Sequence, residues 1–234
     1  MIIKYHHTLL PVLLAAMPAC SSKEARPSST QAVPAQSGAE EESATATSAS
    51  APVTASPSNA VTKASLGQPA PDFTLPALGG GSVSLSEHRG KVVVLEWFNP
   101  DCPFVRQAHA RKEQLLGLAE RHAKEGVVWL AINSGAPGKQ GHGPQANEQG
   151  KQRFAMGHPI LLDEAGTVGR LYGATRTPHM YVIAPSGKLV YRGALDNTRG
   201  GDLEDAEPRF VNYVTAALED LSAGRAVATS ETEP

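Results

Sequence analysis

Apolar and polar residues divide the 234-residue chain into two parts of different character. Residues 20–65 are rich in Ser, Ala, Thr, Pro and Glu and contain no Trp, Tyr, Phe, Leu or Ile. Because such a segment cannot bury enough apolar surface to offset the entropy of ordering it, we expect a disordered tether there. Regular apolar patterns begin at residue 66. They predict one folded domain over residues 66–228, followed by a loose tail at 229–234.

Two mainly apolar runs, residues 92–98 and 127–132, predict strands that are buried on both faces. A helical pattern from 103 to about 124 lies between them, and a strand–helix–strand order implies a right-handed crossover and parallel strands. The other patterns predict strands at residues 72–75, 82–85, 159–163, 177–183 and 189–192, and helices at 145–155, 167–172 and 208–223. This order is typical of an α/β domain.

A single thiol stands where the first buried strand changes into helix. Cys102 follows the turn residues 99–101 and precedes Pro103, a residue favoured at the first position of a helix. Unpaired backbone N–H groups and the positive end of the helix stabilise a thiolate at such a position, so we predict a redox-active Cys102. The alternative is a buried cysteine with only a structural role.

Topology is expected to bring other residues to the same edge of the sheet. In open α/β sheets ligands bind beyond the carboxyl ends of the parallel strands, and Asn133 and Ser134 follow the second buried strand. The strand that begins near Pro178 must run antiparallel to reach this edge. That topology predicts that Thr177, Pro178 and His179 lie near the thiol.

Several of these residues are open to two interpretations. His179 is a candidate base or proton donor, or an exposed histidine without a role. Asn133 and Ser134 are candidate substrate contacts, as is Pro103. Asn99 is a candidate hydrogen-bond donor to a peroxide or a sulfenate, and otherwise a turn-forming residue.

The same motifs resemble those of a known fold. A buried strand ending in Trp-Phe at 97–98, Cys-Pro at 102–103 and a later Thr-Pro at 177–178 before an antiparallel hairpin resemble the thioredoxin fold. The resemblance covers about residues 66–224. It implies a central mixed β-sheet flanked by helices, with Pro178 as a cis proline facing the active Cys102.

The start of the domain narrows the resemblance to one branch of this fold. Pro-Ala-Pro-Asp-Phe-Thr-Leu at 69–75 is similar to the redoxin branch, which comprises alkyl hydroperoxide reductase/thiol-specific antioxidant proteins and membrane-anchored thioredoxin-like reductases. The block at 97–105 resembles a peroxiredoxin-like subgroup in particular.

Two departures from these families bear on the chemistry. A thioredoxin has a second thiol three residues after the first, and here Val105 occupies that place, so a dithiol cycle cannot run within one domain. A peroxiredoxin places Pro and Thr upstream of its peroxidatic thiol, and the Thr is absent here. Asp101 stands beside the sulfur instead, and its charge opposes thiolate formation.

Composition excludes several classes of protein. The net charge of −2 and the pI of about 6.4 give no basic field for nucleic acid. Two cysteines, far apart, exclude a disulfide framework and a multi-cysteine zinc site. We expect neither a metal nor a cofactor.

The amino end resembles a bacterial lipoprotein signal over residues 1–19. Lys4 precedes a short apolar run, and Ala19 precedes Cys20, which would become the lipidated first residue of the mature chain. Met17 and Pro18 depart from the usual box of that signal, and the alternative is an ordinary secretory signal cut near Ala19. The resemblance implies a periplasm-facing lipoprotein of the cell envelope, with the outer membrane favoured over the inner.

Together these features predict an exported redox protein with a single active thiol. Its substrate would be a peroxide, or a protein or low-molecular-weight disulfide. The product would be a sulfenic acid or a mixed disulfide, resolved by an external thiol. The alternative is a non-catalytic binding or redox-sensing module at the membrane.

Overall fold

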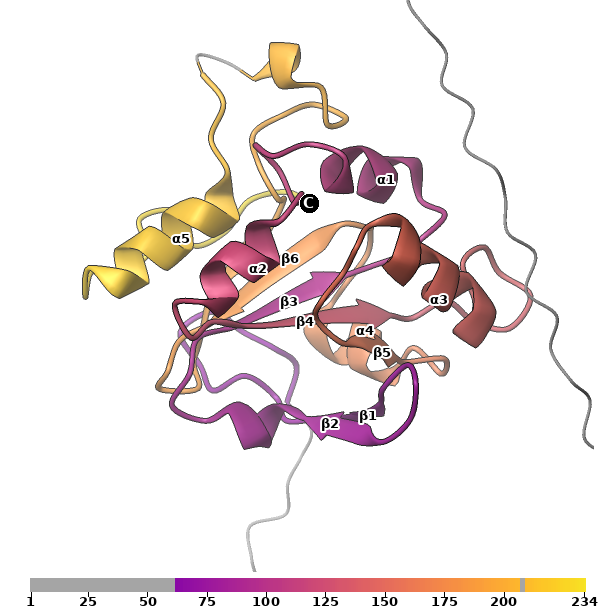
Figure 1. Cartoon of the computed structure of the whole chain (residues 1–234). Coiled ribbons are helices and arrows are strands. Elements are labelled where there is room, and N and C mark those ends of the chain that lie inside the picture. The colour runs from indigo at the N-terminus through magenta and orange to yellow at the C-terminus, as the bar shows by residue number, and fades with distance from the viewer. Residues whose placement is uncertain (1–61, 207–208) are drawn as a thin grey trace, which may run out of the picture. The chain divides into compact units, whose positions relative to one another are not determined.

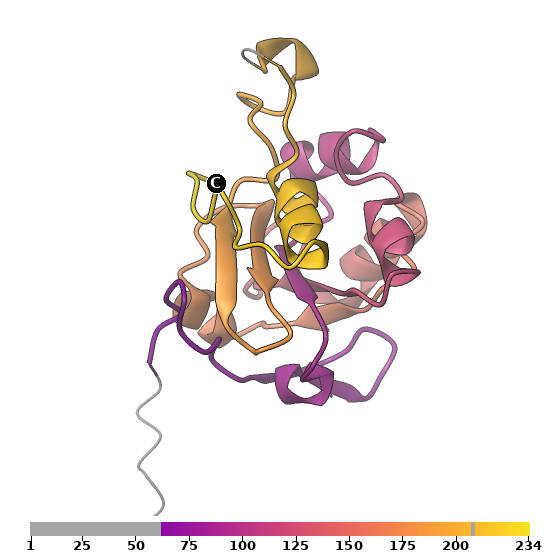
Figure 2. The same cartoon turned by 90° about the vertical axis from the view of Figure 1, so that its left-hand side faces the viewer.

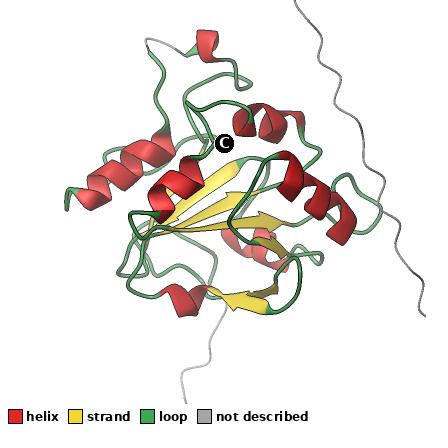
Figure 3. Ribbon diagram, in the orientation of Figure 1, coloured by secondary structure: helices red, strands yellow, loops and turns green. Residues whose placement is uncertain are grey.

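A computed structural model describes residues 62–206 and 209–234. Within these residues a mixed sheet has the strand order β5-β4-β3-β6-β7 (Figures 1 and 3). β3 pairs in parallel with β4 and antiparallel with β6, so both predicted strand directions are confirmed. The sheet strands are β3 (Val93–Trp97), β4 (Val128–Asn133), β5 (Ile160–Leu162), β6 (His179–Ile183) and β7 (Leu189–Gly193).

Helices and a small hairpin cover the sheet. They are β1 (Thr74–Pro76), β2 (Ser82–Ser84), α1 (Pro103–His109), α2 (Leu118–Ala123), α3 (Gly143–Arg153), α4 (Thr167–Tyr172), α5 (Tyr213–Ser222) and the short 3-10 turns η1 (Leu85–His88) and η2 (Leu203–Asp205). The β1–β2 hairpin and α4 lie on one face, and α1, α2, α3 and α5 lie on the other (Figure 1).

Alternation along β3 builds these two layers. Leu95 and Trp97 pack in the cluster under α4 and the hairpin, whereas Val94 packs under α2 and α5. All five residues of β3 are buried, as a central strand covered on both faces requires. The carboxyl ends of β3 and β4 and the start of β6 therefore meet at one edge of the sheet.

Two predicted helices have different limits in the structure. The helix predicted from 103 to 124 is wrong as a continuous element, because the chain leaves the helix after His109 and re-enters it at Leu118. Gly117, with φ +67°, adopts the left-handed conformation that begins α2. The last helix begins at Tyr213 and not at 208. Asn212 caps its start, because the Asn212 side-chain oxygen accepts a hydrogen bond from the Thr215 N–H at 3.0 Å.

The predicted loose tail is also wrong. Residues 229–234 lie along β7, where the Arg192 N–H donates to the Ser230 carbonyl at 3.0 Å and the Thr232 N–H donates to the Arg192 carbonyl at 3.2 Å. At the other end the folded part begins before residue 66, since Ala64 is buried and its N–H donates to the Leu171 carbonyl.

The predicted signal, Cys20 and most of the tether lie outside the described residues. Among the residues that are described, no helix has the length and apolar character needed to cross a membrane.

Candidate functional site

A tight turn carries the chain from β3 to the thiol. Asn99 organises this turn, because its side-chain oxygen accepts from the Asp101 N–H at 2.9 Å and its carbonyl accepts from the Cys102 N–H at 3.1 Å. The Asn99 amide also donates to the Gln140 carbonyl at 3.1 Å. Asn99 is thus a turn-forming residue that holds the 134–143 loop, and Pro103 follows as the first residue of α1.

The thiol faces the residue that precedes the second proline motif. The Cys102 Sγ–H donates to the Thr177 carbonyl oxygen at 3.2 Å, and the Thr177-Pro178 peptide bond is cis. Cys102 is a free, partly exposed cysteine. The expected meeting of Cys102, Thr177 and Pro178 at one edge is what the structure shows.

A cavity of about 850 Å³ opens beside this thiol. Cys102, Thr177 and Pro178 line one part of its wall, the 194–201 loop lines a second part, and residues 232–234 line a third. Phe104 is half exposed and also lines it. Small organic ligands occupy sites of this size, which is far larger than hydrogen peroxide needs.

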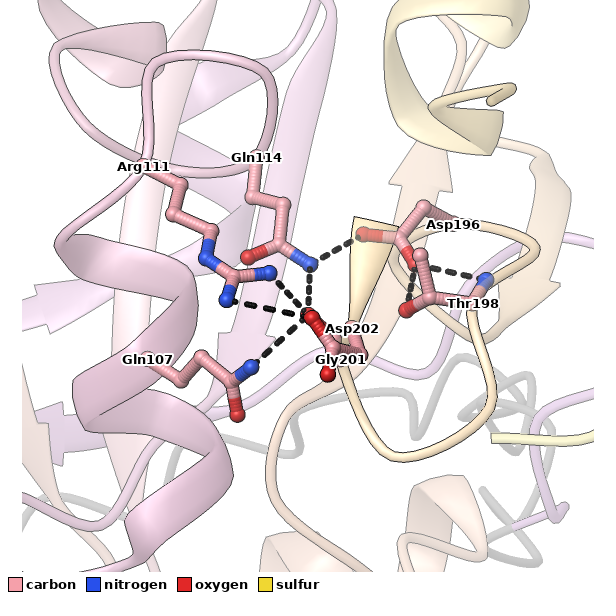
Figure 4. A network of polar contacts seen from close by, with 7 residues as sticks. All are labelled: Gln107, Arg111, Gln114, Asp196, Thr198, Gly201 and Asp202. Atoms are coloured by element: carbon pink, nitrogen blue, oxygen red, sulfur yellow. Dashed lines mark hydrogen bonds and ion pairs between the residues drawn. The ribbon is translucent and has the colours of Figure 1, made fainter. Parts of the chain in front are cut away.

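The second wall is fixed to the helix that carries the thiol. Side-chain donors from Gln107, Arg111 and Gln114 all reach the Gly201 carbonyl oxygen, at 3.0, 2.6 and 3.3 Å (Figure 4). Gln114 also donates to the Asp196 carboxylate at 2.9 Å. Gln107 lies on α1, and Arg111 and Gln114 lie in the segment that follows it, so the loop is bonded both to α1 and to the residues after it.

The structure gives Asn133 and Ser134 internal partners. The Asn133 amide donates to the Gly141 carbonyl at 2.9 Å and to the Asn147 side-chain oxygen at 2.8 Å. The Ser134 hydroxyl donates to Asp163 at 2.7 Å. Neither residue lines the cavity beside Cys102.

His179 is likewise turned into the core. It is 5% exposed, and its ring lies against the Tyr181 ring with the centroids 4.6 Å apart. Burial, together with the charges of Arg192 and Arg176, lowers the pKa of His179 to about 4. His179 is therefore neutral at pH 7 and is not among the residues lining the cavity.

Comparison with known proteins identifies the family to which this chain belongs. The AhpC/TSA family matches residues 66–192. The chain belongs to the AhpC/TSA family. The redoxin family and the thioredoxin-like fold that the sequence resembles are thereby confirmed.

Relatives of this AhpC/TSA chain include two kinds of thiol protein. The thiol-disulfide oxidoreductase ResA of Geobacillus thermodenitrificans (strain NG80-2) is 32% identical over 130 residues, which cover 55% of this chain and 68% of the relative. The chloroplastic peroxiredoxin Q of Suaeda salsa is 29% identical over 144 residues, covering 56% and 61% of the two chains. Both relatives support a thiol redox function.

Among solved structures, an uncharacterized conserved protein from Geobacillus kaustophilus superposes with a TM-score of 0.61 at 29% identity. The superposition covers 72% of this chain and 87% of the other.

In this AhpC/TSA domain an apolar residue, Val105, stands where a dithiol protein has its second cysteine. Val105 is fully buried and packs with Phe98 and Met156. Cys102 is the one cysteine in the part of the chain that the structure describes. Asp101, the acidic neighbour of the thiol, has Arg153 at 4.0 Å, with both side chains about two-fifths exposed.

A buried carboxylate that the sequence patterns did not reveal lies against α1, the helix that follows the thiol. Glu96, the fourth of the five residues of β3, is 0% exposed and lies 2.8 Å from His109 Nε2, and it accepts a hydrogen bond from the Trp129 indole at 3.0 Å. Burial raises the pKa of Glu96, but the charge and hydrogen bond of His109, the charge of His158 and the hydrogen bond of Trp129 together outweigh it, so the net pKa lies below its usual range. The sequence signal that could have revealed Glu96 was an acidic residue inside an otherwise apolar strand.

Among the described residues, no group of three or more His, Cys, Asp or Glu side chains is placed so that it could hold a metal ion.

Proposed function

We propose that this AhpC/TSA chain is an oxidoreductase that uses Cys102 as its single active thiol. With a peroxide, the Cys102 thiolate would attack one oxygen, so that the S–O bond forms as the O–O bond breaks. The leaving oxygen takes a proton and departs as water or an alcohol, and Cys102 is oxidised to a sulfenic acid.

Two external thiols would complete the cycle. The first condenses with the sulfenic acid, which gives a mixed disulfide at Cys102 and releases water. The second attacks that mixed disulfide, which returns Cys102 to the thiol and leaves the two external thiols joined as a disulfide. Two thiols are oxidised for each peroxide reduced.

A disulfide substrate would enter the same cycle at the mixed disulfide. The Cys102 thiolate attacks one substrate sulfur and releases the other as a thiol. An external thiol then attacks the Cys102 sulfur of the mixed disulfide, which releases the second substrate sulfur as a thiol and leaves Cys102 joined to the external thiol. A second external thiol attacks that disulfide, which returns Cys102 to the thiol and leaves the two external thiols joined as a disulfide.

The observation that carries this proposal is the position of the sulfur. Cys102 is partly exposed on a cavity wall, in contact with the Thr177 carbonyl and beside Pro178. A thiolate has no hydrogen to donate, so on deprotonation this contact no longer holds the sulfur, which is then free to face the cavity. Backbone N–H groups in the first turn of α1 would stabilise the anion.

The experiment is to trap the oxidised sulfur. The folded domain is treated with hydrogen peroxide in the presence of dimedone, and the adduct is located by mass spectrometry. We expect one adduct per chain, on Cys102, and none in Cys102→Ser.

A chain without an adduct that also fails to form a mixed disulfide with an added disulfide would overturn the proposal. A Cys102→Ser variant that retained full biological function would favour the non-catalytic binding module instead.

We also propose that the chain is an exported lipoprotein of the cell envelope, on the strength of the apolar run and Cys20 in its amino-terminal sequence. Expressed in a bacterium, the precursor should accumulate when globomycin is added and when Cys20→Ala is introduced. Processing unchanged by either would favour an ordinary secretory signal.

A further inference from the structure

The last residues of the chain form a strap along the outer strand of the sheet. We call residues 229–234 the C-terminal strap. It runs beside β7, where Arg192 and Glu231 form a parallel bridge (Figure 2). Two backbone hydrogen bonds, to Ser230 and from Thr232, join it to Arg192.

Tyr191, Gly193 and Ala194 form the site on which this strap packs, and we call the strap seated when it occupies that site. The Thr232 hydroxyl accepts from the Ala194 N–H at 2.8 Å and donates to the Tyr191 hydroxyl at 2.8 Å. Gly193 lies under it with φ +148°, and a Cβ at this glycine would collide with the Thr232 hydroxyl and lie 2.5 Å from its carbonyl oxygen. A glycine at position 193 is therefore what lets the strap approach.

The end of the strap reaches the thiol site. Residues 232–234 line the cavity that Cys102 also lines. An Arg176 guanidinium N–H donates to the main-chain oxygen of Pro234 at 2.8 Å. Arg176 directly precedes Thr177, whose carbonyl accepts from the thiol, so the segment next to the thiol and the end of the strap form walls of the same cavity.

The strap is held weakly compared with the core. Its side chains, Thr, Ser, Glu, Thr, Glu and Pro, offer no large apolar group. The Arg192–Glu231 ion pair, at 2.7 Å, joins side chains that are 35% and 52% exposed, and such surface pairs contribute little. Segments of this kind open locally without unfolding of the domain.

We propose that the C-terminal strap determines which oxidised substrates reach Cys102, an inference that rests on the proposed thiol chemistry. With the strap seated, the cavity admits a peroxide or a small disulfide. A disulfide in a folded protein carries polypeptide on both sides of its sulfurs, and in this proposal that polypeptide needs the part of the cavity that residues 232–234 line. A protein disulfide is reduced only by molecules whose strap has lifted.

Two unseating variants and a matched control test this. Gly193→Ala places a methyl group against Thr232, and Thr232→Val keeps the shape of the side chain but loses both hydroxyl hydrogen bonds. Thr232→Ser keeps the hydroxyl and is the control. Circular dichroism and the urea unfolding midpoint establish that each variant is folded.

The readout is the rate of mixed-disulfide formation at Cys102 with 5,5′-dithiobis(2-nitrobenzoate) and with a disulfide-bonded folded protein. If the strap is open in about a tenth of wild-type molecules, full unseating raises the protein-disulfide rate about tenfold. Both unseating variants should raise that rate while changing the small-disulfide rate less than about twofold, and Thr232→Ser should match the wild type.

Equal changes in the two rates, or no change in either, would overturn the strap proposal and leave the thiol chemistry standing. If Cys102 reacts with neither disulfide and with no peroxide in any form of the protein, the thiol chemistry and the strap proposal are both overturned.

Discussion

At the residue scale, His179 gives the fold a measurable pH dependence. Its pKa falls from an ordinary 6.5 to about 4 in the folded protein because of burial and the nearby Arg192 and Arg176 charges. Between these values the unfolded chain binds more protons than the folded one, so stability rises with pH across this window and falls as the pH drops through it.

His179→Gln should remove this dependence. Relative to the variant, the wild type should lose up to about 3 kcal/mol of unfolding free energy between pH 7 and pH 4. Urea unfolding at several pH values measures the difference. A gap between the two proteins that stays constant over this range would contradict the buried, neutral state of His179.

Glu96 has a different window, because it is an acid whose pKa is lowered by its contacts to His109 and Trp129. Its stabilising contribution is present above its ordinary pKa of 4.5 and is lost as the pH falls through the lower folded value. Glu96→Gln removes one member of a buried pair and should cost about 3 kcal/mol at pH 7. The cost should shrink in urea unfolding at pH 3.5, and an unchanged cost there would contradict the charged state of Glu96.

At the element scale, Asn133 connects the end of β4 to the 134–143 loop and to α3. Its side chain donates to Gly141 and Asn147 and accepts from the Gly135 N–H at 2.7 Å. Asn133→Ala should therefore lower the unfolding free energy by about 2 kcal/mol, because buried partners lose their hydrogen bonds. The rate of Cys102 with peroxide should stay within about twofold of the wild type, since no contact to the thiol is removed. A lower rate at unchanged stability would instead favour the substrate contact that the sequence suggested.

The first turn of α1 offers a second test, because Val105 lies where a dithiol protein has its second cysteine. Val105→Cys should let the Cys102 sulfenic acid condense with the new thiol inside the same chain. After one equivalent of peroxide, thiol titration and non-reducing mass spectrometry should show one intramolecular disulfide in the variant. Val105→Ala, which adds no thiol, is the control, and the persistence of two free thiols in Val105→Cys would contradict the placement of the two side chains.

At the scale of the whole molecule, the sequence was sufficient to predict the sheet and the edge of the sheet on which the site lies. Apolar runs of strand length specify β3 and β4, and the strand–helix–strand rule makes them parallel, so Cys102 and Asn133 follow strand ends at one edge. The Thr177–Pro178 turn lies at that edge because β6 runs antiparallel to β3, as predicted. The rule that ligands bind beyond the carboxyl ends of parallel strands also suggested Asn133 and Ser134 as substrate contacts. It gives the edge where a residue lies but not the direction of its side chain, and both residues turn to internal partners.

The features that the sequence did not predict depend on contacts without a periodic signal. The strap is polar, and backbone hydrogen bonds to β7 hold it in place. The pattern of its own residues does not encode those bonds. The interruption between α1 and α2 begins after His109 and ends at Gly117, and this single glycine inside an otherwise helical apolar pattern is a sequence signal for its end alone.

The most direct test of the whole account is the second-order rate constant of the Cys102 thiol with hydrogen peroxide at pH 7, compared with that of free cysteine under the same conditions. The account predicts a faster reaction in the folded domain, lost in Cys102→Ser and reduced to the free-cysteine rate when the domain is unfolded in urea. A folded domain whose thiol reacts no faster than free cysteine with peroxide, and no faster with a disulfide, would contradict it.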